Sequence, residues 1–191
     1  MTDTPIELFS RHEPLVLLWP APSGPSVERV FTQAIEWRAF IEAMGLPSPI
    51  PAVTAAKFSR AQTLYLLAWL DPGLIKAGEL AALVALELAL RDRYGGAFKR
   101  KSRFSHLLKH MVEHDGLTDA VVPLVQRCGG TVVGQLTGET RPTLADRRND
   151  LAHGDPFEGW PTGGLLELVR DLIAYAYRDY IAEGRSAERV Q

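Results

Sequence analysis

The chain has 191 residues, of which 46% are hydrophobic and 23% charged, and its formal net charge is −2. This length and mixture fit one globular domain, or one domain with an extension, that buries a core without disulfide staples. The slightly acidic balance excludes a generally basic nucleic-acid-binding protein, so any contact with RNA or DNA must use a local positive patch.

The N-terminal segment lacks the features of a secretory signal. Its start is acidic and its only apolar run is LVLLW, whereas a signal peptide has a basic start and a longer apolar stretch. The runs LYLLAWL and AALVAL are too short to span a bilayer. The one cysteine, Cys128, excludes an internal disulfide, as fits a reducing compartment. We therefore expect a soluble, cytoplasmic protein with no membrane partner.

Residues 1–70 are expected to form an N-terminal arm and two added helices. The run LVLLW lies in a proline-rich region and is either a short strand or part of an extended arm. Apolar residues from Val27 to Ile41 are spaced by three and four, which predicts one amphipathic helix from Ser26 to Gly45. A second helix is predicted over residues 54–70.

The clearest helix of the sequence follows the DPG at positions 71–73. Asp71 is a good N-cap and Pro72 a good first residue, and Gly95 supplies the stop. Its apolar residues cover most of the circumference, which predicts a central and largely buried helix.

Glu87 lies inside the apolar surface of this central helix, which makes it a candidate buried carboxylate. It has the spacing to pair with Arg91 one turn on. If it is buried it needs a cation, and Arg147 or Arg148 is the expected source. We expect the substitution Glu87→Gln to impair the site more than the fold.

The remaining elements are also helical by their patterns. SRFSHLLKHMVEHDG predicts a helix that ends at Gly116, residues 118–127 suggest a short helix, and GGTVVGQLTGE is a glycine-rich connection. Thr143 and Asp146 have the spacing of a capping box, which predicts a helix beginning near Leu144.

Residues 164–183 form the last predicted amphipathic helix, and residues 185–191 a frayed tail. We therefore expect an all-α bundle of five to seven helices, divided into the extension over residues 1–70, the bundle over residues 71–184 and the tail.

A basic turn precedes the helix of SRFSHLLKHMVEHDG. It is the one local cluster of positive charge in a sequence whose net charge is unfavourable for binding nucleic acid. Its side chains either contact RNA phosphates or simply face solvent. These candidates are Lys99, Arg100, Lys101, Arg103 and Lys109, together with the histidine face of the helix that follows the turn.

Three histidines on the same helix, His106, His110 and His114, are spaced by four residues. Neighbouring pairs could hold a metal, as histidines one turn apart do in zinc sites. Because no cysteine lies nearby and no acidic ligand pattern is present, we prefer a polar helix face.

The stretch DRRNDLAHGDP carries the strongest candidates for chemistry. Asn149 and His153 are four residues apart and therefore share one face of the predicted helix. The long side chain of Arg148 bends toward His153, or the two residues meet their equivalents from a second chain across a two-fold axis. A histidine that moves protons beside an arginine that holds phosphate oxygens suits chemistry at a phosphodiester. The alternative is an ordinary solvated helix end.

These features together resemble the HEPN superfamily of helical nucleotide-binding and ribonuclease domains. RNDLAH, at positions 148–153, resembles the family signature of an arginine and a polar residue followed by a histidine after four to six intervening positions. ELAALVALELALRDRYG resembles the long first helix of many members, and the amphipathic helix after the motif is also expected. The resemblance covers residues 71–184.

The resemblance implies a metal-independent endoribonuclease without a cofactor. The ribose 2′-OH attacks its own phosphate, the 5′-oxygen leaves, and a 2′,3′-cyclic phosphate results. His153 would be the general acid or base, Arg148 would stabilise the transition state, and Asn149 would orient the histidine or the phosphate. The implied supporting residues are Arg147, which offers a second motif frame, Glu87 and Asp150.

The family also implies partners. Its ribonucleases are usually homodimers in which two motifs form one composite site on RNA, and some are toxins or antiphage effectors with a protein regulator or antitoxin. In one toxin subgroup a tyrosine two residues after the histidine is modified, but here that position is Asp155, which argues against this regulation. The alternative is a non-catalytic module that binds a nucleotide or a partner protein.

Overall fold

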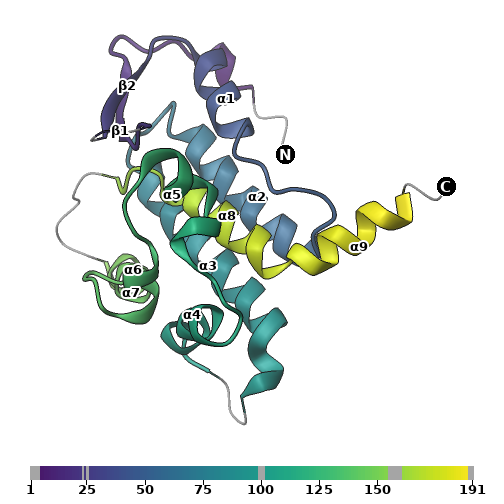
Figure 1. The fold of residues 1–191 in the computed structure, drawn as a ribbon. Coiled ribbons are helices and arrows are strands. Elements are labelled where there is room, and N and C mark those ends of the chain that lie inside the picture. Colours follow the sequence, from purple (N-terminus) through teal and green to yellow (C-terminus); the bar gives the residue numbers. More distant parts are fainter. Residues whose placement is uncertain (1–4, 23, 25, 99–101, 155–160, 189–191) are drawn as a thin grey trace.

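The protein is mostly helical, with one small sheet (Figure 1). The structure is a computed structural model and describes residues 5–22, 24, 26–98, 102–154 and 161–188. The α-helices of the described residues are α1 (Ala34–Glu42), α2 (Ala52–Leu67), α3 (Leu74–Tyr94), α4 (Phe104–Glu113), α5 (Pro123–Cys128), α6 (Val133–Thr137), α7 (Leu144–His153), α8 (Leu165–Ala176) and α9 (Arg178–Glu188). Three short 3-10 helices are η1 (Ile6–Leu8), η2 (Gly95–Ala97) and η3 (Asp119–Val121).

The sheet is an antiparallel pair of β1 (Leu15–Trp19) and β2 (Val27–Phe31). Buried and exposed residues alternate along β1, as expected of a strand with one face on the core, so the strand interpretation of LVLLW is confirmed. The predicted helix from Ser26 to Gly45 is wrong in its first part, because β2 occupies that segment and pairs with β1.

Helix α1 begins only after β2, at a capping box between Gln33 and Glu36. The apolar residues before it are β-branched or aromatic, which suits a strand as well as a helix. Spacing alone did not separate the two structures, because the strand depends on backbone pairing with β1, which the spacing of apolar residues within β2 does not reveal.

Helix α3 is the central buried helix that the sequence predicts. It begins slightly later than expected, because the Asp71 carboxylate accepts the Gly73 N–H at 2.9 Å and closes a turn before the helix. Helix α2 packs along α3, and Gly78 permits the close approach: a Cβ there would lie 2.6 Å from Cδ2 of Tyr65.

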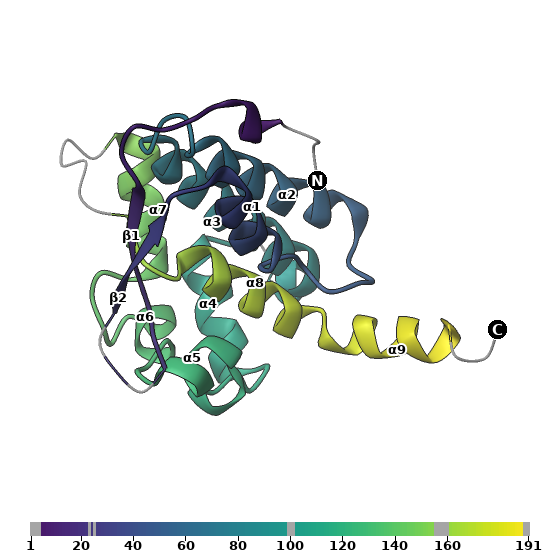
Figure 2. The same cartoon turned by 90° about the horizontal axis from the view of Figure 1, so that it is seen from above.

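The other helices pack around α3 from two directions. Helices α8, α4 and α7 each contact α3, and α6 packs against α4 and α7 (Figures 1 and 2). The buried side chains form one hydrophobic core, in which Trp19 and Trp37 of the N-terminal segment lie together with Leu86 of α3. Figure 2 shows α9 extending away from this bundle.

The described residues contain nine α-helices, more than the predicted five to seven. The glycine-rich connection includes α6, and the last predicted helix divides at Tyr177 into α8 and α9. The tail that was expected to begin at residue 185 is helical as far as Glu188. None of the described helices is both long enough and apolar enough to cross a membrane.

Candidate functional site

Helix α7 carries the whole RNDLAH motif. The predicted capping box is confirmed: Thr143 Oγ1 accepts the Asp146 N–H at 3.0 Å, and Asp146 Oδ2 accepts the Thr143 N–H at 3.0 Å. The helix ends where Gly154 adopts a left-handed conformation, with φ of 74°. Asn149 and His153 therefore lie on one face of a regular helix, as predicted.

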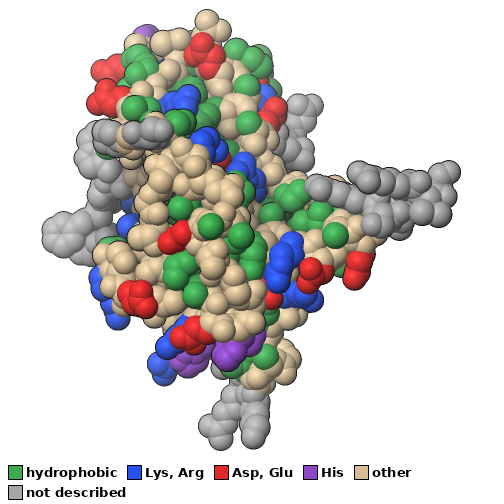
Figure 3. All heavy atoms as spheres, in the orientation of Figure 1, with side chains coloured by type: hydrophobic (Ala, Val, Ile, Leu, Met, Phe, Trp, Pro, Cys, Tyr) green, Lys and Arg blue, Asp and Glu red, His purple; other side chains and the backbone are tan. Residues whose placement is uncertain are grey.

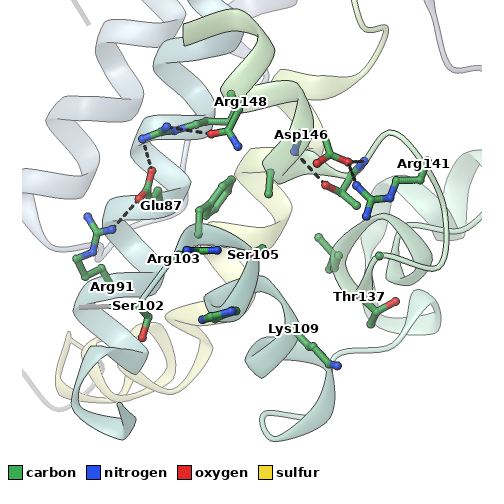
Figure 4. Close-up of a pocket in the computed structure, with 17 residues that line it drawn as sticks. Glu87, Arg91, Ser102, Arg103, Ser105, Lys109, Thr137, Arg141, Asp146 and Arg148 are labelled. Atoms are coloured by element: carbon green, nitrogen blue, oxygen red, sulfur yellow. Dashed lines mark hydrogen bonds and ion pairs between the residues drawn. The ribbon is translucent and has the colours of Figure 1, made fainter. Parts of the chain in front are cut away.

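Glu87 of α3 lies beneath the motif, and its side chain is only 11% exposed. Its Oε1 accepts a hydrogen bond from Arg91 at 2.6 Å, and its Oε2 lies 3.0 Å from Nη2 of Arg148. The expected pairing with Arg91 and the expected pairing with Arg148 are both confirmed, and they exist at the same time (Figure 4). Arg148 also donates to Oδ1 of Asn149 at 3.1 Å, so its guanidinium is held on two sides.

Arg147 points to a different acid from its neighbour. Its Nη1 donates to Oγ1 of Thr162 at 3.1 Å, and the Thr162 N–H donates to the carboxylate of Glu79. Glu79 is 1% exposed, and Nζ of Lys76 lies 3.4 Å from its Oε2. Burial raises the pKa of Glu79, although Lys76 and the Thr162 N–H oppose the shift.

A cleft of about 700 Å³ opens between α3, α4 and α7 (Figure 4). Five cationic side chains and two acidic ones line it, so the described wall carries an excess of three positive charges without counting its histidine, His106. The cations are Arg91, Arg103, Lys109, Arg141 and Arg148, and the acids are Glu87 and Asp146. This wall is a local excess of positive charge on a chain whose formal net charge is −2.

Both acids of the cleft are already engaged. Glu87 holds the two arginines described above, and Asp146 pairs with Arg141. Arg103, at the N-cap of α4, is exposed, and its side chain has no ion pair or hydrogen bond among the described residues. Figure 3 shows basic and histidine side chains gathered at the lower edge of the molecule, over α4.

The structure separates some of the predicted site residues. Arg148 and Asn149 line the cleft with Arg103, whereas His153 and Asp150 are exposed on α7 outside its lining. Lys99, Arg100 and Lys101 fall outside the described residues. Arg147 lies away from the cleft beside Thr162.

Two cleft residues were not predicted as part of the site. Arg141 lies in a loop without periodicity, and its only signal was the neighbouring capping box. His106 was predicted to lie on a polar helix face, with RNA contact or metal binding as the alternatives, and it shares the cleft with Arg148. The spacing of residues in the sequence does not show that either position lies near the motif in space.

The three histidines of α4 do not gather around one point. His106 lines the cleft, whereas the His110 ring packs against Tyr94 and against His114, with ring centroids 5.1 Å and 4.7 Å apart. The described part of the chain holds no group of three or more His, Cys, Asp or Glu side chains placed to bind a metal ion. The three-histidine alternative therefore has no geometric support.

The charge and shape of the cleft therefore suit an anion that arginine can bind, above all a phosphate. Arg148 and Asn149 are the motif residues that line the cleft. Compared with protein-family models, with curated proteins and with solved structures, the chain shows no match.

Proposed function

We propose that this protein is a metal-independent endoribonuclease of the HEPN type, in which α7 carries the catalytic residues. The observation that supports this most is the buried carboxylate of Glu87, which braces Arg148 at the wall of a cleft with excess positive charge. A guanidinium that is already oriented stabilises developing phosphate charge without reorganisation during the reaction.

Each motif residue has a role in the proposed reaction. Arg148 uses one Nη–H group on Glu87 and one on Asn149, and its Nε is buried, which leaves two Nη–H groups for the non-bridging oxygens of the scissile phosphate. The ribose 2′-oxygen forms a bond to phosphorus as the bond to the 5′-oxygen breaks. The proton of the 2′-OH passes to His153 or an equivalent base, and the 5′-oxygen gains a proton in turn.

A homodimer would complete this site. His153 lies at the exposed end of α7, and no described residue forms a hydrogen bond or ion pair with its side chain. We propose that the α7 helices of two protomers face each other across a two-fold axis, so that His153 of one chain acts beside Arg148 of the other. The resemblance extends the proposal to a cytoplasmic toxin or antiphage effector, with a protein regulator or antitoxin as a further partner.

The first test incubates the protein with mixed RNA in excess EDTA and examines the product ends. Wild type is compared with His153→Ala and with His114→Ala, a histidine control distant from the motif in the sequence. Only His153→Ala should abolish the 2′,3′-cyclic phosphate ends, with the melting temperature unchanged. The proposal would be contradicted if the His153→Ala variant still cleaved RNA, or if EDTA stopped cleavage by the wild-type protein.

The second candidate is a non-catalytic module that binds a nucleotide. It is favoured by the position of His153 outside the cleft, because phosphate binding in the cleft needs no proton transfer. This module would bind a nucleotide in EDTA and leave RNA intact at all protein concentrations. Detection of cyclic-phosphate ends made by wild type would exclude it.

A further inference from the structure

Three cations of the cleft take no part in holding Glu87. Arg103 and Lys109 come from α4, and Arg141 comes from the loop before α7, so they approach the cleft from different elements (Figure 4). The Arg103 side chain has no ion pair or hydrogen bond among the described residues. Lys109 pairs with Glu113 and Arg141 with Asp146, and the side chains of Lys109 and Arg141 are 53% and 71% exposed. Exposed ion pairs of this kind stabilise a fold very little, so these charges are free to engage a ligand.

The cleft concentrates like charges on a concave surface. The two acids neutralise only part of the five cations, and the walls of a cleft focus the remaining positive potential. The first turn of α4 also borders the cleft, and no side chain caps it, which adds the positive end of a helix dipole to the same space. An anion in the cleft would therefore relieve repulsion that the acids of the cleft and Glu113, the partner of Lys109, compensate only in part.

The ligand chemistry follows from the type and number of these cations. Arginine presents its N–H groups in a planar fork that matches the oxygens of a phosphate. The volume of about 700 Å³ lies within the range of ligand sites and exceeds what one phosphate fills. A single-stranded nucleic acid satisfies both conditions, because it brings a phosphate together with the adjoining sugar and base.

We propose that the cleft is a phosphate subsite for a single-stranded nucleic acid, in which Arg103, Lys109 and Arg141 bind the backbone next to the phosphate that Arg148 contacts. His106 borders this subsite and offers a ring N–H or nitrogen to the same strand. The location of the neighbouring reactive phosphate rests on the proposed ribonuclease function. Backbone binding in the cleft does not, because it involves no chemical step.

The test measures binding of a fluorescent single-stranded DNA oligonucleotide, which lacks the 2′-OH and is therefore not consumed. Arg103→Glu and Arg141→Glu are compared with wild type and with Arg60→Glu, a matched charge reversal at an exposed position of α2. Each cleft variant should weaken binding roughly tenfold or more, as expected for one charge-assisted phosphate contact, and flatten the salt dependence. Arg60→Glu should bind like wild type.

Binding by both cleft variants that equals wild type would overturn the subsite. Melting temperatures check folding, and Arg103→Gln and Arg141→Gln serve as milder variants if a reversal unfolds the chain. Adenosine 5′-monophosphate is added as a competitor. If it displaces the labelled oligonucleotide at a concentration equal to that of the oligonucleotide, the cleft binds a mononucleotide and the proposal of a nucleic-acid strand is overturned.

The results separate this inference from the proposed function. If the cleft variants lose DNA binding while wild type never cleaves RNA, the subsite stands and the ribonuclease proposal fails. If wild type cleaves RNA and the cleft variants bind DNA unchanged, the ribonuclease stands and the subsite fails.

Discussion

Helix α3 carries two buried glutamates, Glu79 in its first half and Glu87 in its second half, and their surroundings differ in charge balance. At the Glu87 end two arginines share one carboxylate beside an open cleft with excess positive charge. At the Glu79 end the carboxylate is almost fully buried, and its pKa is raised by that burial. The same residue type on the same helix therefore serves two purposes: one glutamate orients cations toward a cleft, and the other completes an internal contact.

The two adjacent arginines of α7 lie near different glutamates of α3. Arg148 contacts Glu87 at 3.0 Å, whereas Arg147 reaches Thr162 beside Glu79. Neighbouring residues on a helix point about 100° apart, so one step in sequence directs the two side chains to different parts of α3. Variants at either end of α3 should therefore have separable effects.

The largest effect is expected from comparing Arg148→Ala with Arg147→Ala. If the protein cleaves RNA as proposed, Arg148→Ala should slow cleavage about 10²-fold, the usual cost of removing one donor to transition-state charge. Arg147→Ala should instead lower the melting temperature, because it removes the hydrogen bond to Thr162. Rates of cleavage and thermal unfolding curves measure both effects. Equal loss of activity in the two variants would contradict the assignment of Arg148.

Gly78→Ala should damage the Glu79 end and spare the cleft. The new Cβ would meet the buried ring of Tyr65 at 2.6 Å, and such overpacking costs about 1–3 kcal/mol. The melting temperature should fall by several degrees, whereas binding of single-stranded DNA by the folded protein should not change. Gly96→Ala is the control, because a Cβ at Gly96 meets nothing within 4 Å. Equal stability of both variants would show that α2 and α3 adjust without strain.

Glu79→Gln should have the smallest effect, on the pH dependence of stability. Because the pKa of Glu79 is raised above its ordinary value of 4.5, the folded state holds this proton more tightly than the unfolded chain. The resulting stabilisation is fully present below about pH 4.5 and is lost as pH rises through the raised pKa.

Glutamine at position 79 keeps an oxygen for the Thr162 N–H and removes this titration. The free energy of unfolding of Glu79→Gln should therefore fall less than that of wild type as pH rises from about 4.5 toward neutrality. Urea unfolding at a series of pH values measures this, and Glu139→Gln on the exposed surface controls for the loss of one carboxyl group. If the free energies of unfolding of wild type and Glu79→Gln changed equally with pH, the prediction would be contradicted.

Local features of the fold were predictable because their causes lie within a few residues. The capping box of Thr143 and Asp146 begins α7 at Leu144, and the buried character of α3 follows from its apolar circumference. Of the two strands of the β1–β2 hairpin, β2 was not predicted, because the spacing of its apolar residues also fits a helix. Only the pairing of β2 with β1 excludes that helix.

The sequence by itself determined the helical body, the end of α7 and the pairing of Glu87 with a motif arginine. These follow from periodicity, capping and the cost of burying an unpaired carboxylate. Only the tertiary structure decided that Arg148 contacts Glu87 while Arg147 contacts Thr162, and that Arg103, His106 and Arg141 share a cleft with Arg148. Packing of α4 and α7 on α3 brings these residues together, and that packing depends on contacts between segments far apart in the sequence.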